Sequence, residues 1–148
     1  MTTLATNKQR QFQIDDKEEY PVIAADIIFQ GAAVGENGAG YARPLAAGDA
    51  FLGFAVAKAD NAAGAAGAIG VQVRTRGRIR LTVAGATTVA ANDRVPVYAS
   101  DDDTFTLTAT SNSLIGFVSR WIASTDCIVE FDAALAKAHT DALAAAAA

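Results

Sequence analysis

The 148-residue chain has few of the residues that form disulfides and metal sites, and it lacks the long apolar runs of membrane spans. Its single cysteine, Cys127, excludes a disulfide within the chain and a metal site built from several cysteines. No run of about 20 apolar residues occurs, and the opening MTTLATNKQRQ lacks the apolar centre of a signal peptide. We therefore expect a soluble protein with no membrane partner, made in a cytoplasm and stabilised by packing or association.

Groups suited to catalysis are also scarce. The only histidine, His139, lies in an alanine-rich tail far from Cys127 in sequence, and no serine stands in a nucleophile-elbow pattern. The glycines of residues 31–40 are not followed by the lysine of a phosphate-binding loop, so a plain loop is favoured there. Residues 101–103, all aspartate, indicate a hairpin turn, because the alternating ligands of a calcium loop are missing. We predict no enzyme activity, no cofactor, no metal and no small-molecule substrate.

Charge is sparse and mostly negative. Charged residues make up 19% of the chain, and the net charge is −4 with an isoelectric point near 4.8. An acidic protein is an unlikely general binder of nucleic acid, whose usual footprint is a basic domain. So few charges also suggest that other chains cover part of the apolar surface.

One basic feature stands out against this acidic background. Within VQVRTRGRIRLTV, every second residue from 74 to 80 is arginine: Arg74, Arg76, Arg78 and Arg80. This alternation predicts a β-strand with one charged face, which we call the arginine ladder. Three roles remain open for it: pairing with carboxylates such as Glu130 or Asp132, docking to an acidic protein, or contact with nucleic-acid phosphates.

The pattern of short apolar runs predicts an all-β fold. Runs rich in β-branched and aromatic residues alternate with glycine-, asparagine- and aspartate-rich turns, which is typical of a compact β-sandwich or barrel. The expected strands are residues 22–30, 41–45, 51–58, 68–83, 94–98, 104–108, 114–122 and 127–132. In the last of these, Cys127, Val129 and Phe131 alternate with polar positions, so we expect the cysteine to face the core.

The chain divides into three parts by composition. Residues 1–20 read as an extended N-terminal arm in which Phe12 and Ile14 alternate with polar residues, and Pro21 marks the entry to the domain. Residues 21–132 form the β domain. Residues 133–148 are alanine-rich and predict either a short helix, with Asp132 as a possible N-cap, or a loose tail.

The order of these segments resembles the head decoration, or capsid cement, proteins of tailed bacteriophages. The resemblance covers about residues 22–132 and rests on FLGFAVAKADNAAG, VQVRTRGRIRLTV, NDRVPVYASDDDTF, SLIGFVSRW and CIVEF. It implies a compact β domain of the β-tripod type, usually trimeric. It also implies a location in the virion, on the outer capsid surface, with the major capsid protein as partner.

The functional expectation is a structural virion protein that strengthens a phage shell. The candidate partner-binding residues are Phe12 and Ile14 in the arm together with Arg74, Arg76, Arg78 and Arg80 in the ladder. The alternative is a small β-barrel that binds nucleic acid through the ladder, although the strand lacks the exposed aromatics that such barrels use to stack bases. A receptor- or sugar-binding tail module is a third possibility that would need an exposed aromatic pocket.

Overall fold

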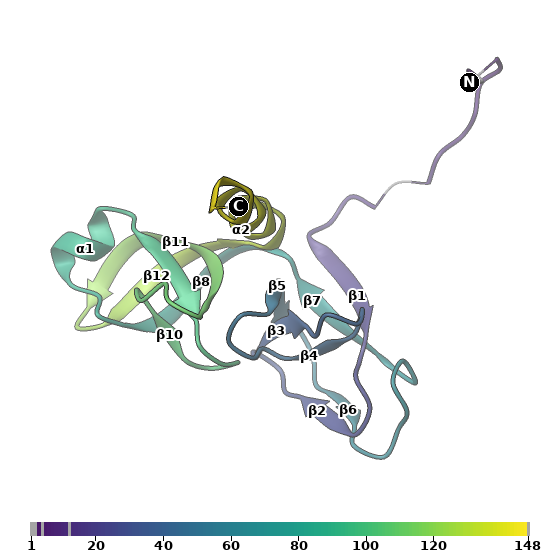
Figure 1. The fold of residues 1–148 in the computed structure, drawn as a ribbon, viewed down its shortest axis with the longest axis horizontal. Helices are drawn as coiled ribbons and strands as arrows, with labels where there is room; N and C mark the ends of the chain where they lie inside the picture. Colours follow the sequence, from purple (N-terminus) through teal and green to yellow (C-terminus); the bar gives the residue numbers. More distant parts are fainter. Residues whose placement is uncertain (1–2, 4, 12, 148) are drawn as a thin grey trace.

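The protein is built mainly from β-strands, as the sequence predicts. The computed structural model describes residues 3, 5–11 and 13–147, and within them twelve strands and two helices are present. Figure 1 shows two β lobes side by side, with helix α2 seen nearly end-on above their junction and the N-terminal segment extending outwards. No helix in these residues is both long and apolar enough to span a membrane.

The first lobe is an antiparallel sheet with a small two-stranded companion. The sheet has the order β1 (Lys17–Pro21), β7 (Gly70–Arg74), β5 (Ala50–Ala55), β3 (Ala33–Glu36) and β4 (Ala42–Pro44). The companion pairs β2 (Asp26–Ile28) with β6 (Ala59–Asn61). Val22, Ile28, Val34, Val71 and Val73 form the centre of its core.

The second lobe is a closed five-stranded barrel. Its ring has the order β10 (Phe105–Thr106), β8 (Arg76–Ala84), β12 (Asp126–Asp132), β11 (Ser113–Ala123) and β9 (Pro96–Ala99), and helix α1 (Thr88–Asn92) follows β8. Cys127 is fully buried among Val83, Val97, Ile115 and Val129, so the predicted inward face of β12 is confirmed. Strands β9 and β10 form the expected hairpin around residues 101–103.

Four phenylalanines join the two lobes into one body. Phe51 and Phe54 of β5 reach into the barrel core, where Phe54 packs edge-on to Phe131 with ring centroids 4.9 Å apart. Phe54 also meets Phe105, and Phe51 meets Phe131, at centroid distances of 5.9 and 6.2 Å. Burial of large aromatic surface between the lobes makes them depend on each other for stability.

The predicted strand of residues 68–83 is in fact two strands. It breaks at Thr75, where the backbone N–H donates to the carbonyl of Asp16 at 2.7 Å and the carbonyl accepts from Ala133 N at 2.8 Å. Strand β7 before the break belongs to the sheet, and β8 after it belongs to the barrel. The alternation of side chains continues across Thr75, so the sequence pattern carried no sign of the crossing.

Four short elements fall where the sequence predicted none. Strand β6 (Ala59–Asn61) lies in residues expected as a turn between the strands of 51–58 and 68–83. Strand β1 occupies residues expected in the arm, so the part of the chain outside the body ends near Asp15 rather than at residue 20. Strand β3 lies within the glycine-rich residues 31–40. Helix α1 begins after Thr87, whose hydroxyl accepts from Ala90 N at 3.2 Å and acts as its N-cap.

The alanine-rich end forms helix α2 (Ala133–Ala147), the first of the two alternatives. Asp132 caps it, since one of its carboxylate oxygens accepts from Leu135 N at 3.0 Å. The helix packs on β5 and β11 and buries Ala136, while Leu135 and Leu143 remain more than half exposed. A helix attached by so little apolar area relies on its cap and on alanine's high helix propensity.

Candidate protein-binding surfaces

The arginine ladder is divided between the two lobes. Arg74 ends β7, whereas Arg76, Arg78 and Arg80 project from one face of β8. The side chains of the last three are 60 to 68% exposed, so they are available to a partner. Gly77 interrupts them with a φ of +151°, where a side chain would be strained.

Carboxylates of the same chain neutralise most of the ladder. Arg78 pairs with Glu130 of the neighbouring strand β12 at 3.4 Å, as the register of the two strands predicts. Arg80 pairs with Asp126 at 3.1 Å. Arg76 pairs with Asp16 at 2.8 Å. The carboxylate-pairing role is therefore present within one chain, with Asp16 and Asp126 as partners that the sequence did not single out.

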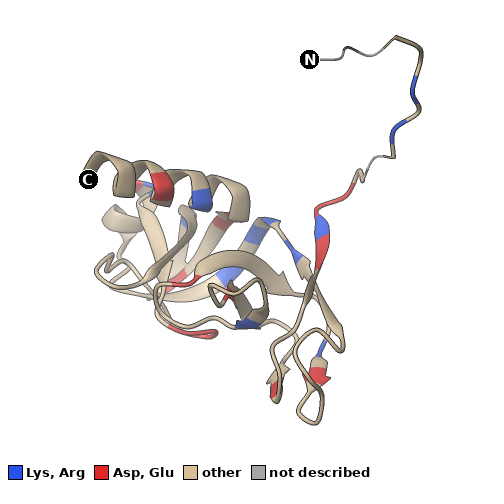
Figure 2. Ribbon diagram, turned by 45° about the vertical axis from the view of Figure 1, so that its right-hand side comes forward, with Lys and Arg blue, Asp and Glu red and all other residues tan. Residues whose placement is uncertain are grey.

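The other charged groups near the ladder have different surroundings. Hydrogen bonds from Thr82 and Arg80 hold the pKa of Asp126 below its usual value, so this carboxylate stays charged beside the arginines. Asp132 caps α2 instead of pairing with an arginine. Arg74 has no ion pair among the residues that the structure describes. Figure 2 shows basic and acidic residues interspersed over the body.

We expect the native protein to bind duplex DNA too weakly to detect at physiological ionic strength. Three of the four arginines already face a carboxylate, so few counterions would be released on binding. Changing Asp126→Asn and Glu130→Gln should uncover the arginines and produce weak, salt-dependent binding in a fluorescence anisotropy titration. Tight binding by the native chain that Arg76→Gln and Arg78→Gln abolish would instead support the nucleic-acid alternative.

The N-terminal segment is the most exposed part of the protein. The described residues before Asp15 make no regular structure and extend away from the body (Figure 1). Ile14 is 97% exposed although it is strongly apolar. Phe12, the other predicted contact residue of the arm, lies outside the described residues. The structure thus separates Ile14 from the core.

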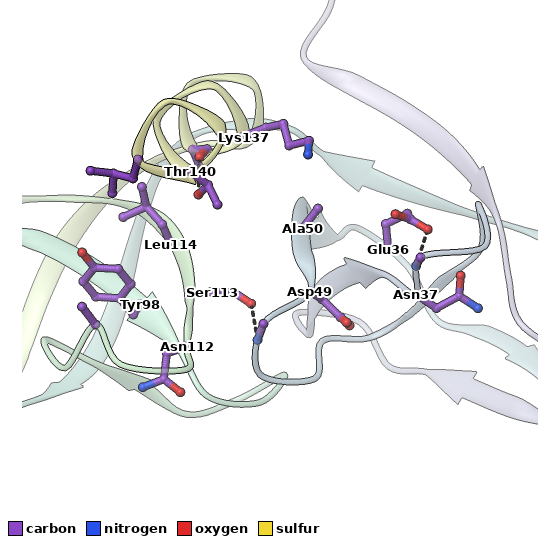
Figure 3. Close-up of a pocket in the computed structure, with 15 residues that line it drawn as sticks. Glu36, Asn37, Asp49, Ala50, Tyr98, Asn112, Ser113, Leu114, Lys137 and Thr140 are labelled. Carbon is purple, nitrogen blue, oxygen red and sulfur yellow. Dashed lines mark hydrogen bonds between the residues drawn. The ribbon is translucent and has the colours of Figure 1, made fainter. Parts of the chain in front are cut away.

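A hollow lies between α2 and the two lobes. It has a volume of about 550 Å³ and is lined by polar residues such as Glu36, Asp49 and Lys137 and by apolar ones such as Leu114 and Leu143. Figure 3 shows that its polar side chains come from β3, the loop before β5, β11 and α2.

The polar groups of this hollow already have structural tasks. Asp49 pairs with Arg43 at 2.7 Å, and the hydrogen bond raises the pKa of that arginine. Ser113 accepts from Gly48 N at 3.0 Å, and Lys137 pairs with Asp141 at 2.9 Å. Glu36 accepts from two glycine N–H groups of the turn between β3 and β4. Such engaged groups do not make a nucleophile with a base or a charge relay.

Comparisons with known proteins add no functional assignment. Neither protein-family models, nor curated proteins, nor solved structures match this chain. Within the described residues no group of three or more histidine, cysteine, aspartate or glutamate side chains is placed to hold a metal ion. Function must therefore be argued from the surfaces themselves.

An acidic hairpin tip forms the remaining charged feature. Asp101 closes the β9–β10 turn by accepting from Asp103 N at 2.8 Å and from the Thr104 hydroxyl at 3.0 Å. Burial raises the pKa of Asp102, and the nearby charges of Asp101, Asp103 and Asp26 raise it further. These interactions match the turn role that the sequence predicted for residues 101–103.

Sequence reasoning found the exposed arm but missed the strand that follows it. The acidic run DDKEE gave no sign of β1, because charged residues are poor strand formers and show no apolar alternation. One signal was available in the sequence: Tyr20 and Pro21 directly follow the charged residues. Charged residues together with proline are typical of edge strands. Strand β1 connects the arm to the body and is the second candidate surface.

Proposed function

We propose that the protein is a structural virion protein that binds the outer surface of a tailed-phage capsid and stabilises the shell. In this proposal it acts as a homotrimer of β-tripod domains, with the major capsid protein as partner and without catalytic chemistry. The sequence resemblance over residues 22–132 supports the assignment. The largely β architecture with a projecting arm is compatible with it.

One observation carries the proposal: a compact β body bears an extended, exposed arm with an apolar residue that the body leaves uncovered. Ile14 is almost fully exposed, and in the sequence Phe12 precedes it by two residues, the spacing that places side chains on one face of a strand. An apolar side chain in water gains about 1.5–3 kcal/mol when a partner buries it fully. An arm of this kind suits attachment to a neighbouring protein.

The multiplicity of a trimer strengthens such a contact. Three arms on one particle bind with a high effective concentration, so individually modest contacts are enough to hold the body in place. A closed three-fold arrangement also covers apolar surface between subunits. In this proposal, many modest contacts of a small protein together stabilise a much larger object.

Removal of residues 1–14 should abolish binding to capsids and leave the body folded. The deletion ends before Asp16, whose carbonyl accepts from Thr75 N, so the sheet keeps its first strand. Co-sedimentation with undecorated heads of the phage that encodes the chain measures binding, and the thermal midpoint of unfolding reports the fold. Undiminished co-sedimentation of the truncated protein would contradict the arm's role as anchor.

A point variant sharpens this experiment. Ile14→Asp should weaken capsid binding about tenfold or more, because it places a charge where an apolar contact is proposed. Val89→Asp on α1 is the matched control, since Val89 is also exposed but lies away from the arm. Equal loss of binding in both variants would indicate a general effect of charge.

A further inference from the structure

Strand β1 has an open edge with hydrogen-bonding groups that face outwards. Its inner side pairs with β7, and among the described residues no strand lies on its other side. The N–H groups of Lys17 and Glu19 donate to nearby side-chain oxygens, of Asp15 at 3.3 Å and of Glu18 at 3.4 Å. These long, local contacts show that both N–H groups point away from β7. A new strand could replace them with stronger main-chain hydrogen bonds.

The charges on this edge disfavour pairing with a second β1. Asp15, Glu18 and Glu19 have no ion pair within the described part of the chain, and Lys17 is the one basic residue of the strand. Two such edges side by side would bring like charges together, which is how sheet proteins prevent edge-to-edge association. The edge should therefore accept a basic strand and reject an acidic one.

The chain itself carries a segment with the required properties. The first 14 residues contain Lys8 and Arg10 and no acidic residue, which leaves ten basic and sixteen acidic residues, a net charge of −6, for the remainder. Residues 7–11, NKQRQ, equal β1 in length, contain neither glycine nor proline, and alternate amide and basic side chains. All five are exposed. Figure 2 shows this contrast as basic positions along the arm and acidic ones where it joins β1.

In the structure the arm does not fold back onto the β1 edge of its own chain (Figure 1). A two-residue turn at Asp15 and Asp16 would need positive φ at its first central residue, and neither has it. Asp16 is also fixed to the body by its carbonyl, which accepts from Thr75 N, and by its carboxylate, which pairs with Arg76. These contacts direct the arm away from the edge that follows it.

We propose that residues 7–11 of one copy add as a strand to the open edge of β1 in a second copy. Residues 12–16 then link the two bodies across at most about 17 Å, the reach of five extended residues. The contact joins different surfaces on the two copies, so it runs head to tail and closes into a ring when the rotation allows. The proposal does not rest on the capsid role, because it needs no partner other than this chain.

The test is a charge exchange in the full-length protein without capsids. Lys8→Glu with Arg10→Glu reverses the arm, and Glu18→Lys with Glu19→Lys reverses the edge. Each variant alone should self-associate at least about tenfold more weakly than the native chain, because like charges then meet. An equimolar mixture of the two should recover association through the reversed arm of one and the reversed edge of the other. Sedimentation velocity gives the mass of each species.

Two further variants separate this contact from general charge effects. Asp93→Lys with Asp103→Lys makes the same change of charge at exposed positions outside β1 and should associate like the native protein. Glu19→Pro removes an outward N–H that the β7 ladder does not use, and should abolish association while the circular dichroism spectrum stays native. Native-like association of Glu19→Pro would overturn the proposal.

The remaining outcomes are equally decisive. A native chain that stays monomeric, or a mixture of reversed variants that fails to recover association, would overturn the arm-to-edge contact. Normal self-association by a protein that ignores capsids would retain it and remove the capsid role. Capsid binding by a chain that remains monomeric in solution would retain the binding to capsids and overturn the arm-to-edge contact.

Discussion

Replacing Gly53 by alanine is expected to lower the free energy of unfolding by about 4 kcal/mol, which combines about 1–3 kcal/mol for overpacking with about 1–2 kcal/mol for a side chain at positive φ. Gly53 lies on β5 where it passes β7, with a φ of +139°. A Cβ there would overlap the carbonyl oxygen of Arg74 and lie 2.9 Å from its carbonyl carbon. Backbone cannot move aside as a flexible side chain can, so thermal denaturation should show a midpoint lower by about 10 °C or more.

Two other glycines separate the cost of a side chain at positive φ from the cost of steric overlap. Gly31 has a φ of +86° and open space around it, so Gly31→Ala should cost only the about 1–2 kcal/mol of a left-handed residue. Gly116 has no positive φ, but a Cβ would lie 2.7 Å from the Cα of Phe131, so Gly116→Ala tests overlap alone. A Gly53→Ala protein no less stable than Gly31→Ala would contradict the close crossing of β5 and β7.

Phe54→Ala should destabilise the protein by about 3–5 kcal/mol, as expected for the loss of a large buried aromatic side chain. Phe54 extends from the sheet into the barrel core and contacts Phe51, Phe105 and Phe131. Its removal leaves a cavity between the lobes, so unfolding should also become less cooperative. Urea denaturation followed by Trp121 fluorescence, which reports the barrel, and by far-ultraviolet circular dichroism, which reports both lobes, should then give separate midpoints.

Phe29→Ala provides the control for this variant. Phe29 is 56% exposed, and the ammonium of Lys58 lies 5.3 Å from its ring centroid. An exposed cation–π contact contributes about 0.5–1 kcal/mol, so the loss of stability should be correspondingly small. Similar losses in Phe29→Ala and Phe54→Ala would mean that the aromatic cluster does not hold the lobes together.

The strands of the barrel could be predicted because their side chains follow a period of two. Cys127, Val129 and Phe131 alternate with polar neighbours, and the structure buries these three and exposes or half-exposes the others. The turn at residues 101–103 was equally legible from its aspartates. In both places local sequence and tertiary position require the same residue types.

The division into two lobes could not be predicted in the same way. Residues 70–84 alternate without interruption, yet Thr75 carries the chain from one sheet to another through bonds to Asp16 and Ala133. Those partners are far away in sequence, so no local pattern encodes them. The same reason explains why Asp16, remote from the ladder, was missed as the partner of Arg76.

The candidate surfaces show the same limit. Exposure of Ile14 followed from the polar composition around it, and the structure agrees. The open edge of β1 did not follow, because a strand of charged residues is recognised only when its partner β7 is known. The sequence therefore indicated which side chains are exposed, and the structure showed which backbone groups of β1 have no strand partner.

The attachment of the arm to β1 determines how the protein would respond to mechanical force. The arm leaves the body at the start of the strand (Figure 1), and β1 lies alongside β7 over five residue pairs. Tension applied through the arm and along the axis of β1 would load these ladder bonds together in shear, whereas a pull across the strand would break them one at a time. The bonds of Asp16 to Thr75 and Arg76 lie at the point where tension enters and act as a clamp.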